Sequence, residues 1–230
     1  MTSILESKIE NGIAQITLNN GKVNAISHEL IDAFHAALDQ ADEANAVVVI
    51  TGQAGIFSGG YDLKTMQKSL PDALNLVKAG SSLSRRLLSF PTPVIAACAG
   101  HAIAKGAFIL LSSDYRIGAT GPYKIGLNEV AIGITMHYAG IELANYRLAL
   151  PYFDRAVSTA EIFNPEQACL AGFLDEVVEP DQVLARAHEV AAHYRGTLNM
   201  KAHHQTKLKA REGFLAALDE AIAKDESGTL

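Results

Sequence analysis

The sequence predicts an α/β protein in which a mostly parallel sheet is covered by helices. Short apolar strand candidates alternate with longer segments of helical spacing through the first half of the chain. From Val157 onward the composition shifts toward helix-forming residues. Alternation of this kind is typical of parallel sheets with helices on their faces. Apolar residues make up 49% of the 230, so a large core can be buried.

The first elements are a β-hairpin and a β-α-β unit. Alternating runs at residues 4–10 and 13–18 flank Asn11-Gly12, a pair that favours a tight hairpin turn. Ser27 can cap a helix whose apolar residues recur at helical spacing. The valine-rich run at residues 47–50 follows as a buried strand.

The remaining elements follow from the same criteria. We expect helices at residues 71–88, 106–112, 183–194, 198–209 and 212–224, and strands at 94–97, 115–119, 123–125 and 175–178. The helical tail is too short to bury much core alone, so we expect it to pack on the sheet or on a neighbouring subunit. We therefore divide the chain into a core domain, residues 1–195, and a C-terminal helical segment, residues 196–230.

Charge and cysteine usage exclude several functional classes. With 19 Lys and Arg against 25 Asp and Glu, the net charge of −6 argues against general binding of nucleic acid or anionic lipid. Cys98 and Cys169 lack metal-binding spacing, so we expect buried free thiols and no metal site. The N-terminus lacks the pattern of a secretion signal, and no stretch is apolar enough to span a bilayer. We expect a cytoplasmic protein without membrane contacts.

Two glycine-containing loops, residues 52–64 and 97–107, each follow a buried strand and lead into a helix. Backbone N–H groups at such turns lack partners, and one from each loop can converge on a single oxygen and stabilise negative charge there. The alternative is that the glycines only permit tight turns. Neither loop has a nucleotide-phosphate motif, and the chain has no GxSxG motif of a serine hydrolase.

Glu129 is the candidate acid or base. It is the one carboxylate in a largely apolar run, residues 125–134. Desolvation in such surroundings raises the pKa of a carboxyl group toward the value that a general base needs. An exposed loop glutamate is an equally good interpretation of the same run.

Four further segments, taken with these loops and Glu129, resemble the crotonase, or enoyl-CoA hydratase/isomerase, superfamily. They are LNNGKVNAI at 18–26, FSGGYDL at 57–63, SDYRI at 113–117 and ACLAGFLDEVV at 168–178. Their order and spacing carry the resemblance over most of the chain. It implies a spiral of ββα turns and a helical C-terminal segment that supports a homotrimer or a dimer of trimers.

The resemblance also implies roles for individual residues. It assigns an oxyanion hole to the backbone N–H groups of Tyr61 and Lys105, with Gly106 as an alternative one residue further along. Lys105 stands where the family usually has glycine. The positions that would fold around coenzyme A are Val23, Ala25, Gly60, Asp62, Leu63 and Lys64. For the Asp62 and Lys64 side chains we favour a helix cap and a solvated helix face, so binding there would be mainly through the backbone.

One departure from the family pattern narrows the expected reaction. Hydratases of the family use two glutamates, and Phe108 occupies the position of the first one here. The sequence is closer to mitochondrial-type Δ3,Δ2-enoyl-CoA isomerases, which use a single glutamate. Glu129 would move a proton from C2 to C4 of a 3-enoyl-CoA while the oxyanion hole holds the dienolate. The substrate is an acyl-CoA thioester, and no separate cofactor is expected.

Three alternatives stay open at this point. The first alternative to an isomerase is a hydratase or another lyase in which Glu129 acts with water. The second is a non-catalytic acyl-CoA-binding protein of the same fold. His137 is either a second acid or base or, as we favour, a hydrogen-bonded structural histidine. Asp114 and Arg116 are expected to form a structural pair on one strand.

Overall fold

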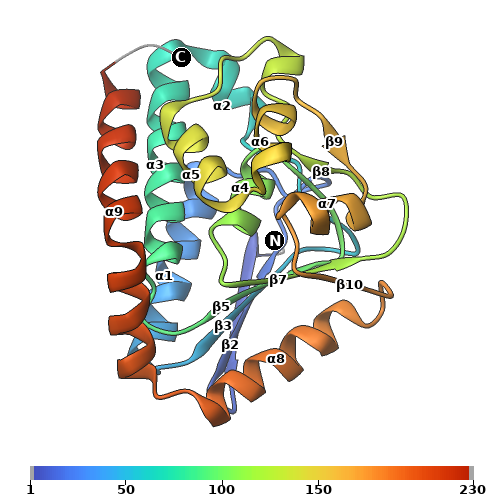
Figure 1. Ribbon diagram of the computed structural model, residues 1–230, viewed down its shortest axis with the longest axis vertical. Coiled ribbons are helices and arrows are strands. Elements are labelled where there is room, and N and C mark those ends of the chain that lie inside the picture. Colours follow the sequence, from blue (N-terminus) through green and yellow to red (C-terminus); the bar gives the residue numbers. More distant parts are fainter. Residues whose placement is uncertain (1–2, 228–230) are drawn as a thin grey trace.

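Two sheets form the framework of the computed structural model, which describes residues 3–227 (Figure 1). The larger sheet has six strands in the order β1-β2-β3-β5-β7-β10, all parallel to their neighbours except β1 with β2. The smaller sheet has four strands in the order β4-β6-β8-β9, with β9 antiparallel to β8. The strands are β1 (Leu5–Glu10), β2 (Ile13–Leu18), β3 (Val47–Thr51), β4 (Gly55–Ser58), β5 (Val94–Cys98), β6 (Gly100–Ile103), β7 (Tyr115–Ala119), β8 (Ile125–Gly126), β9 (Ile162–Phe163) and β10 (Glu176–Val178).

The chain winds through these sheets as the expected spiral of ββα turns. From β3 in the larger sheet it passes to β4 in the smaller one and then into helices, and β5 and β6 repeat this path. The helices are α1 (His28–Glu43), α2 (Leu63–Lys68), α3 (Leu70–Leu88), α4 (Lys105–Leu111), α5 (Tyr138–Arg147), α6 (Leu150–Val157), α7 (Pro165–Ala171), α8 (Val183–Thr197) and α9 (Met200–Glu226), with one 3₁₀ turn, η1 (Val130–Ile132). The predicted fold class is therefore confirmed.

Strand alternation places a core on each face of the larger sheet. Val48 and Ile50 point to the face covered by α1 and α3, whereas Val47 and Val49 pack against Ala187 and its neighbours on α8. Because successive side chains of a strand face opposite ways, one apolar run serves both cores. Figure 1 shows α8 lying across the sheet strands on the side away from α1.

The C-terminal tail differs from the prediction. Residues 198–209 and 212–224 were expected to be two helices, but residues 200–226 form the single helix α9. The intervening Ala210 and Arg211 are good helix formers, and Gly213 alone does not break a helix this long. α9 packs along α3 and α5 of the same chain (Figure 1). Residue 196, the expected start of the C-terminal segment, lies in the last turn of α8.

Other expectations were wrong in detail. The loops at 52–64 and 97–107 contain the short strands β4 and β6, and α5 and α6 were not predicted. The strand expected at 123–125 begins only at Ile125.

Two expectations about individual side chains need correction. Asp114 and Arg116 do not pair with each other: Asp114 binds Lys207 and Arg211, while Arg116 binds Asp175. Asp114 lies just before β7, and each of the two side chains finds its own partner from another element. Cys98 is buried as expected, whereas Cys169 is partly exposed on α7.

Candidate active site

The two glycine-containing loops meet side by side. Their strands β4 and β6 pair in parallel, with Gly55 opposite Gly100, and a Cβ on Gly100 would lie 2.0 Å from the Gly55 carbonyl carbon. Further on, a Cβ on Gly60 would lie 2.9 Å from the Ala104 Cβ and 3.6 Å from the Lys105 backbone nitrogen. Glycine at these positions therefore does more than permit a turn, since it lets two backbones approach closely.

Two backbone N–H groups at this junction have no acceptor within residues 3–227. The two neighbours of Tyr61 are both bonded to Ile26: the Gly60 carbonyl accepts from the Ile26 N–H, and the Asp62 N–H donates to the Ile26 carbonyl. The N–H of Tyr61 itself takes part in neither hydrogen bond. Lys105 is the first residue of α4, so its N–H has no partner within the helix. Gly106, the alternative, packs instead against Ser58, whose carbonyl oxygen would be 2.4 Å from an added Cβ. The N–H groups of Tyr61 and Lys105 are the ones expected to form an oxyanion hole.

Glu129 lies between β8 and η1 and is buried, with 7% of its surface exposed. Its Oε2 has no hydrogen-bond partner in the described part of the chain. Burial raises the pKa of Glu129 to about 7. A carboxyl group with this pKa can both take up and release a proton near neutral pH, and the exposed-loop alternative is excluded.

Glu129 opens onto a cavity of about 190 Å³. The cavity is lined by Gly59, Tyr61, Leu63, Met66, Val77, Ala104, Asn128, Glu129, Ile132, Ile134, Thr135 and His137. Glu129 is the only carboxylate among these described residues, and most of the others are apolar. Such a cavity suits an apolar chain beside one titratable group.

The buried carboxyl group predicts a pH-dependent cost in stability. Because its pKa rises from 4.5 unfolded to about 7 folded, the folded state is favoured below pH 4.5 and loses this advantage as pH rises through 7. Glu129→Gln should therefore gain roughly 3 kcal/mol of unfolding free energy relative to wild type between pH 4 and pH 8. Urea unfolding at both pH values measures it, with the exposed Glu6→Gln as control. An equal difference at both pH values would contradict a raised pKa.

His137 lines the same cavity but is poorly suited to proton transfer. It is buried at the start of α5, and its ring meets Phe108 edge-on with 5.3 Å between ring centroids. Burial, and then the charge of Lys105, lower the pKa of His137 to about 3, which keeps the ring neutral at pH 7. No hydrogen bond of the described residues involves this ring. His137 is therefore structural as expected, but it is held by packing against Phe108 and not by a hydrogen bond.

The six residues expected around coenzyme A fall on two adjoining segments. Val23 and Ala25 belong to a stretch that runs beside Gly60, joined to it by hydrogen bonds from Gly59 N to Val23 O and from Ile26 N to Gly60 O. Asp62, Leu63 and Lys64 begin α2 on the far side of Gly60.

Their side chains divide as expected. The Asp62 carboxylate caps α2 by accepting from the Thr65 N–H, and the Thr65 hydroxyl holds the pKa of Asp62 below its usual range. Val23, Leu63 and Lys64 are exposed. Of these six residues, Leu63 lines the cavity.

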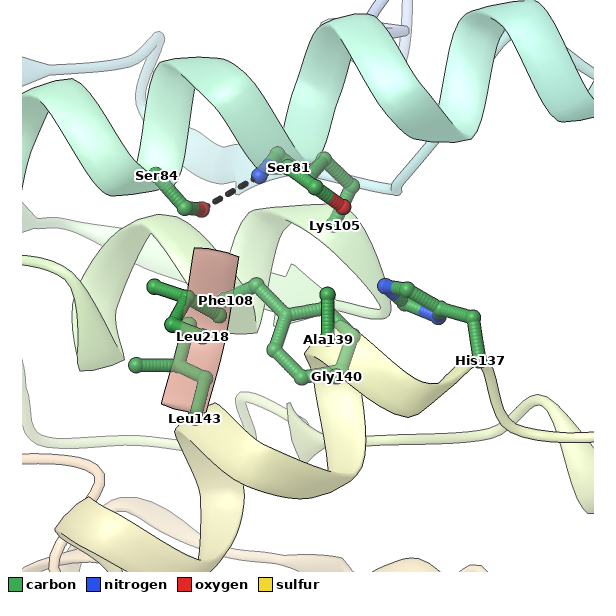
Figure 2. Close-up of a pocket in the computed structure, with 9 residues that line it drawn as sticks. All are labelled: Ser81, Ser84, Lys105, Phe108, His137, Ala139, Gly140, Leu143 and Leu218. Atoms are coloured by element: carbon green, nitrogen blue, oxygen red, sulfur yellow. Dashed lines mark hydrogen bonds between the residues drawn. The ribbon is translucent and has the colours of Figure 1, made fainter. Parts of the chain in front are cut away.

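The side chain of Lys105 turns away from this cavity. It is buried, and its Nζ donates to the Gly80 carbonyl at 2.5 Å and to the Ser84 hydroxyl at 2.6 Å, both on α3. Figure 2 shows the contact with Ser84 beside a second, water-sized cavity of about 10 Å³ that is also lined by His137 and Phe108. Only the backbone of Lys105 is directed to the junction of the loops.

Sequence reasoning missed several residues at this site. Asn128, Val77, Ile132 and Ile134 line the cavity but were not singled out. One signal in the sequence indicated that this face of the predicted helix at residues 71–88 packs closely on something, namely Gly80. A glycine inside a helix lowers stability by about 1 kcal/mol relative to alanine, so it calls for a packing reason. That reason is the Tyr61 phenol, which lies where a Gly80 side chain would be.

Comparison with known proteins identifies the family. The family model for enoyl-CoA hydratase/isomerase matches residues 8–225. The chain belongs to the enoyl-CoA hydratase/isomerase family. A crystal structure of an enoyl-CoA hydratase/isomerase family protein from Pseudomonas syringae is 56% identical, with a TM-score of 0.97 and 99% of this chain and 98% of that chain covered.

Relatives within the family carry both names. Enoyl-CoA delta isomerase 1, mitochondrial, from Mus musculus is 30% identical over 96% of this chain and 82% of its own length. A structure described as enoyl-CoA hydratase from Mycobacterium ulcerans is 40% identical, with a TM-score of 0.93 and 98% and 99% of the two chains covered. The protein is therefore an enoyl-CoA hydratase/isomerase family enzyme. Similarity alone does not decide between the two reactions.

Two further observations concern what the described residues lack. No helix within residues 3–227 is long and apolar enough to cross a membrane. In the same range no group of three or more His, Cys, Asp or Glu side chains is arranged to hold a metal ion.

Proposed function

We propose that the protein is a Δ3,Δ2-enoyl-CoA isomerase with Glu129 as its acid and base. The observation that carries this proposal is the single buried carboxylate of the cavity, whose pKa of about 7 suits proton transfer in both directions. Phe108, at the position of the first glutamate of hydratases, is buried and packs on His137. A one-carboxylate site favours a proton shift over hydration by a carboxylate pair.

The proposed reaction moves one proton within the substrate. Glu129 takes the proton from C2 of a 3-enoyl-CoA, and the electrons shift into a dienolate whose negative charge rests largely on the thioester oxygen. The N–H groups of Tyr61 and Lys105 donate to that oxygen. Protonated Glu129 then returns the proton to C4, which leaves the double bond between C2 and C3.

The coenzyme A portion is proposed to bind outside this cavity. Val23 and Ala25 on one segment, and Gly60 through Lys64 on the other, flank the approach to the loop junction. The exposed Val23 and Leu63 side chains suit the methylenes of the pantetheine arm. Assembly as a homotrimer or a dimer of trimers remains a prediction.

Hydration is the second candidate, and Asn128 favours it. Its Oδ1 is buried without a hydrogen-bond partner among the described residues, as is Oε2 of Glu129, and both residues line the cavity. Two free acceptors at one cavity can hold a water molecule between them. Addition of that water to a 2-enoyl-CoA would then need only Glu129 as its base.

The two reactions differ in product mass. Incubation with a 3-enoyl-CoA should yield the conjugated 2-enoyl-CoA at unchanged mass, followed by its absorbance and by mass spectrometry. Incubation with a 2-enoyl-CoA should add no water. A gain of one water mass from the 2-enoyl substrate, without isomerisation of the 3-enoyl one, would replace the isomerase proposal with the hydratase.

A further inference from the structure

The side chains of both proposed oxyanion donors dock on adjacent turns of α3, between Val77 and Ser84. Lys105 Nζ donates to the Ser84 hydroxyl (Figure 2) and to the Gly80 carbonyl. The Tyr61 hydroxyl donates to the Val77 carbonyl at 3.4 Å. A Cβ on Gly80 would lie 2.2 Å from this same hydroxyl oxygen. Gly80 thus contacts both side chains: its carbonyl accepts from Lys105, and the Tyr61 hydroxyl occupies the space that a side chain on Gly80 would fill.

The position of the Lys105 ammonium is unfavourable on general grounds. A buried cation costs several kcal/mol unless it is well paired, and Lys105 is only 1% exposed with no carboxylate partner in the described range. It also starts α4, where the helix dipole favours negative rather than positive charge. A lysine retained in such a place calls for a compensating role.

The backbone just before Lys105 needs support. Ala104 has φ 50° and ψ −120°, a conformation that residues with a side chain rarely adopt, and no side chain caps the start of α4. Strain of this kind costs on the order of 1–3 kcal/mol and persists only where surrounding contacts enforce it. Ala104 itself donates from its backbone N–H to the Gly126 carbonyl, and the two hydrogen bonds of Lys105 to α3 hold the residue that follows it.

We propose that Lys105 is a positioning residue, whose buried side chain, clamped to the Gly80–Ser84 turn of α3, fixes its own backbone N–H at a set spacing from that of Tyr61. This inference rests on the proposed function, because the spacing matters only if the two N–H groups hold a thioester oxygen. According to this proposal, α3 fixes the positions of both glycine-containing loops relative to each other. The lysine side chain itself touches no reacting atom.

The protonation state of Lys105 does not decide whether the clamp holds. Burial lowers the pKa of Lys105 to about 7, while its two hydrogen bonds favour the ammonium form. A neutral amine still carries two N–H donors, enough for both acceptors. Burial also raises the pKa of the Tyr61 phenol, so that hydroxyl remains a donor.

The test compares ligands with and without a negative thioester oxygen. Acetoacetyl-CoA forms an enolate, whereas butyryl-CoA keeps a neutral carbonyl, and calorimetry gives the dissociation constant of each. The preference is the dissociation constant of butyryl-CoA divided by that of acetoacetyl-CoA. In Lys105→Met, which keeps an unbranched side chain and removes the donors, this ratio should fall roughly 10-fold. For the 3-enoyl substrate, kcat should fall by a similar factor with KM within about 2-fold, the pattern of an interaction made in the transition state.

Lys207 provides a matched control. It is also a buried lysine, 5% exposed, with Nζ bonded to Asp114 and to the Phe90 carbonyl, and it lines neither cavity. Lys207→Met should lower stability without changing the ligand preference. Gly80→Ala, which pushes on the Tyr61 phenol and leaves Lys105 in place, should reduce the preference like Lys105→Met. If Lys105→Met does not fold, Ser84→Ala carries the test with an expected 3-fold loss, on the order of one neutral hydrogen bond.

Each outcome decides the inference. An unchanged preference and kcat in folded Lys105→Met would overturn it, as would an equal loss of affinity for both ligands, which marks a purely structural role. A wild-type protein that binds both ligands but does not isomerise refutes the proposed reaction, and the ligand preference still tests the clamp. A wild-type protein that binds neither ligand removes both proposals.

Discussion

Glu129→Gln should lower kcat for the isomerisation of a 3-enoyl-CoA by about 10² to 10⁴, the range that a positioned acid or base contributes. Glutamine fills the same space in the cavity but neither accepts nor returns a proton. KM should change little, because the proposed coenzyme A contacts lie on the segments around Val23 and Gly60 rather than at Glu129. Steady-state kinetics on both proteins measure this, with exposed Glu166→Gln on α7 as the control.

The pH profile of the wild type should point to the same group. Glu129 acts as a base only when ionised, and its pKa is raised to about 7. Below that pH, kcat/KM should fall about tenfold per pH unit, and above it the value should level off. If Glu129→Gln kept the wild-type kcat, another group would carry the proton, and His137 would be the next to test.

Local features of the chain made much of the fold predictable. Asn11 and Gly12 both adopt positive φ, 51° and 74°, as the hairpin turn requires. Ser27 accepts from the Leu30 N–H and caps α1 where expected. These features depend on residues a few positions apart, so the sequence displays them directly.

The elements that were missed depend on distant partners. The strands β4 and β6 have four residues each, and each forms by pairing with the other, 45 positions away in the sequence. Gly100 allows the two backbones to approach closely. The start of α5 has no side-chain cap of its own. The carboxylate of Asp225, near the end of α9, accepts from the N–H groups of Tyr138 and Ala139 instead. No local pattern could reveal a cap supplied by the tail.

The candidate site divides in the same way. A lone acid in an apolar run marked Glu129, and two glycine loops marked where backbone N–H groups could meet. Only the resemblance to the family then named Tyr61 and Lys105. What the lysine side chain does could not be inferred, since its acceptors lie on α3, 21 and 25 positions earlier. Alignment with a family places a backbone N–H but not the packing that holds it.

Gly60→Ala should lower kcat/KM by about 10² to 10³, the loss expected when one oxyanion donor is misplaced. The added Cβ would lie 2.9 Å from the Ala104 Cβ and 3.3 Å from the Ile103 carbonyl oxygen, between the two loops. Something must move apart, and the Lys105 backbone nitrogen lies 3.6 Å from the same Cβ, while Tyr61 is the next residue after Gly60. Alanine also fits poorly at φ 103°. Kinetics with a 3-enoyl-CoA, together with thermal unfolding, measure both effects.

Gly55→Ala separates strain from spacing. Gly55 lies on β4 in the same loop at φ 80°, but an added Cβ there meets nothing within 4 Å. This variant should lose about 1–2 kcal/mol of stability from backbone strain and keep most of its activity. Equal losses of activity in the two variants would mean that strain in the loop, not the gap between the donors, controls the rate. A loss confined to Gly60→Ala would instead tie the rate to the distance between two backbone N–H groups, which is the quantity that the clamp on α3 is proposed to set.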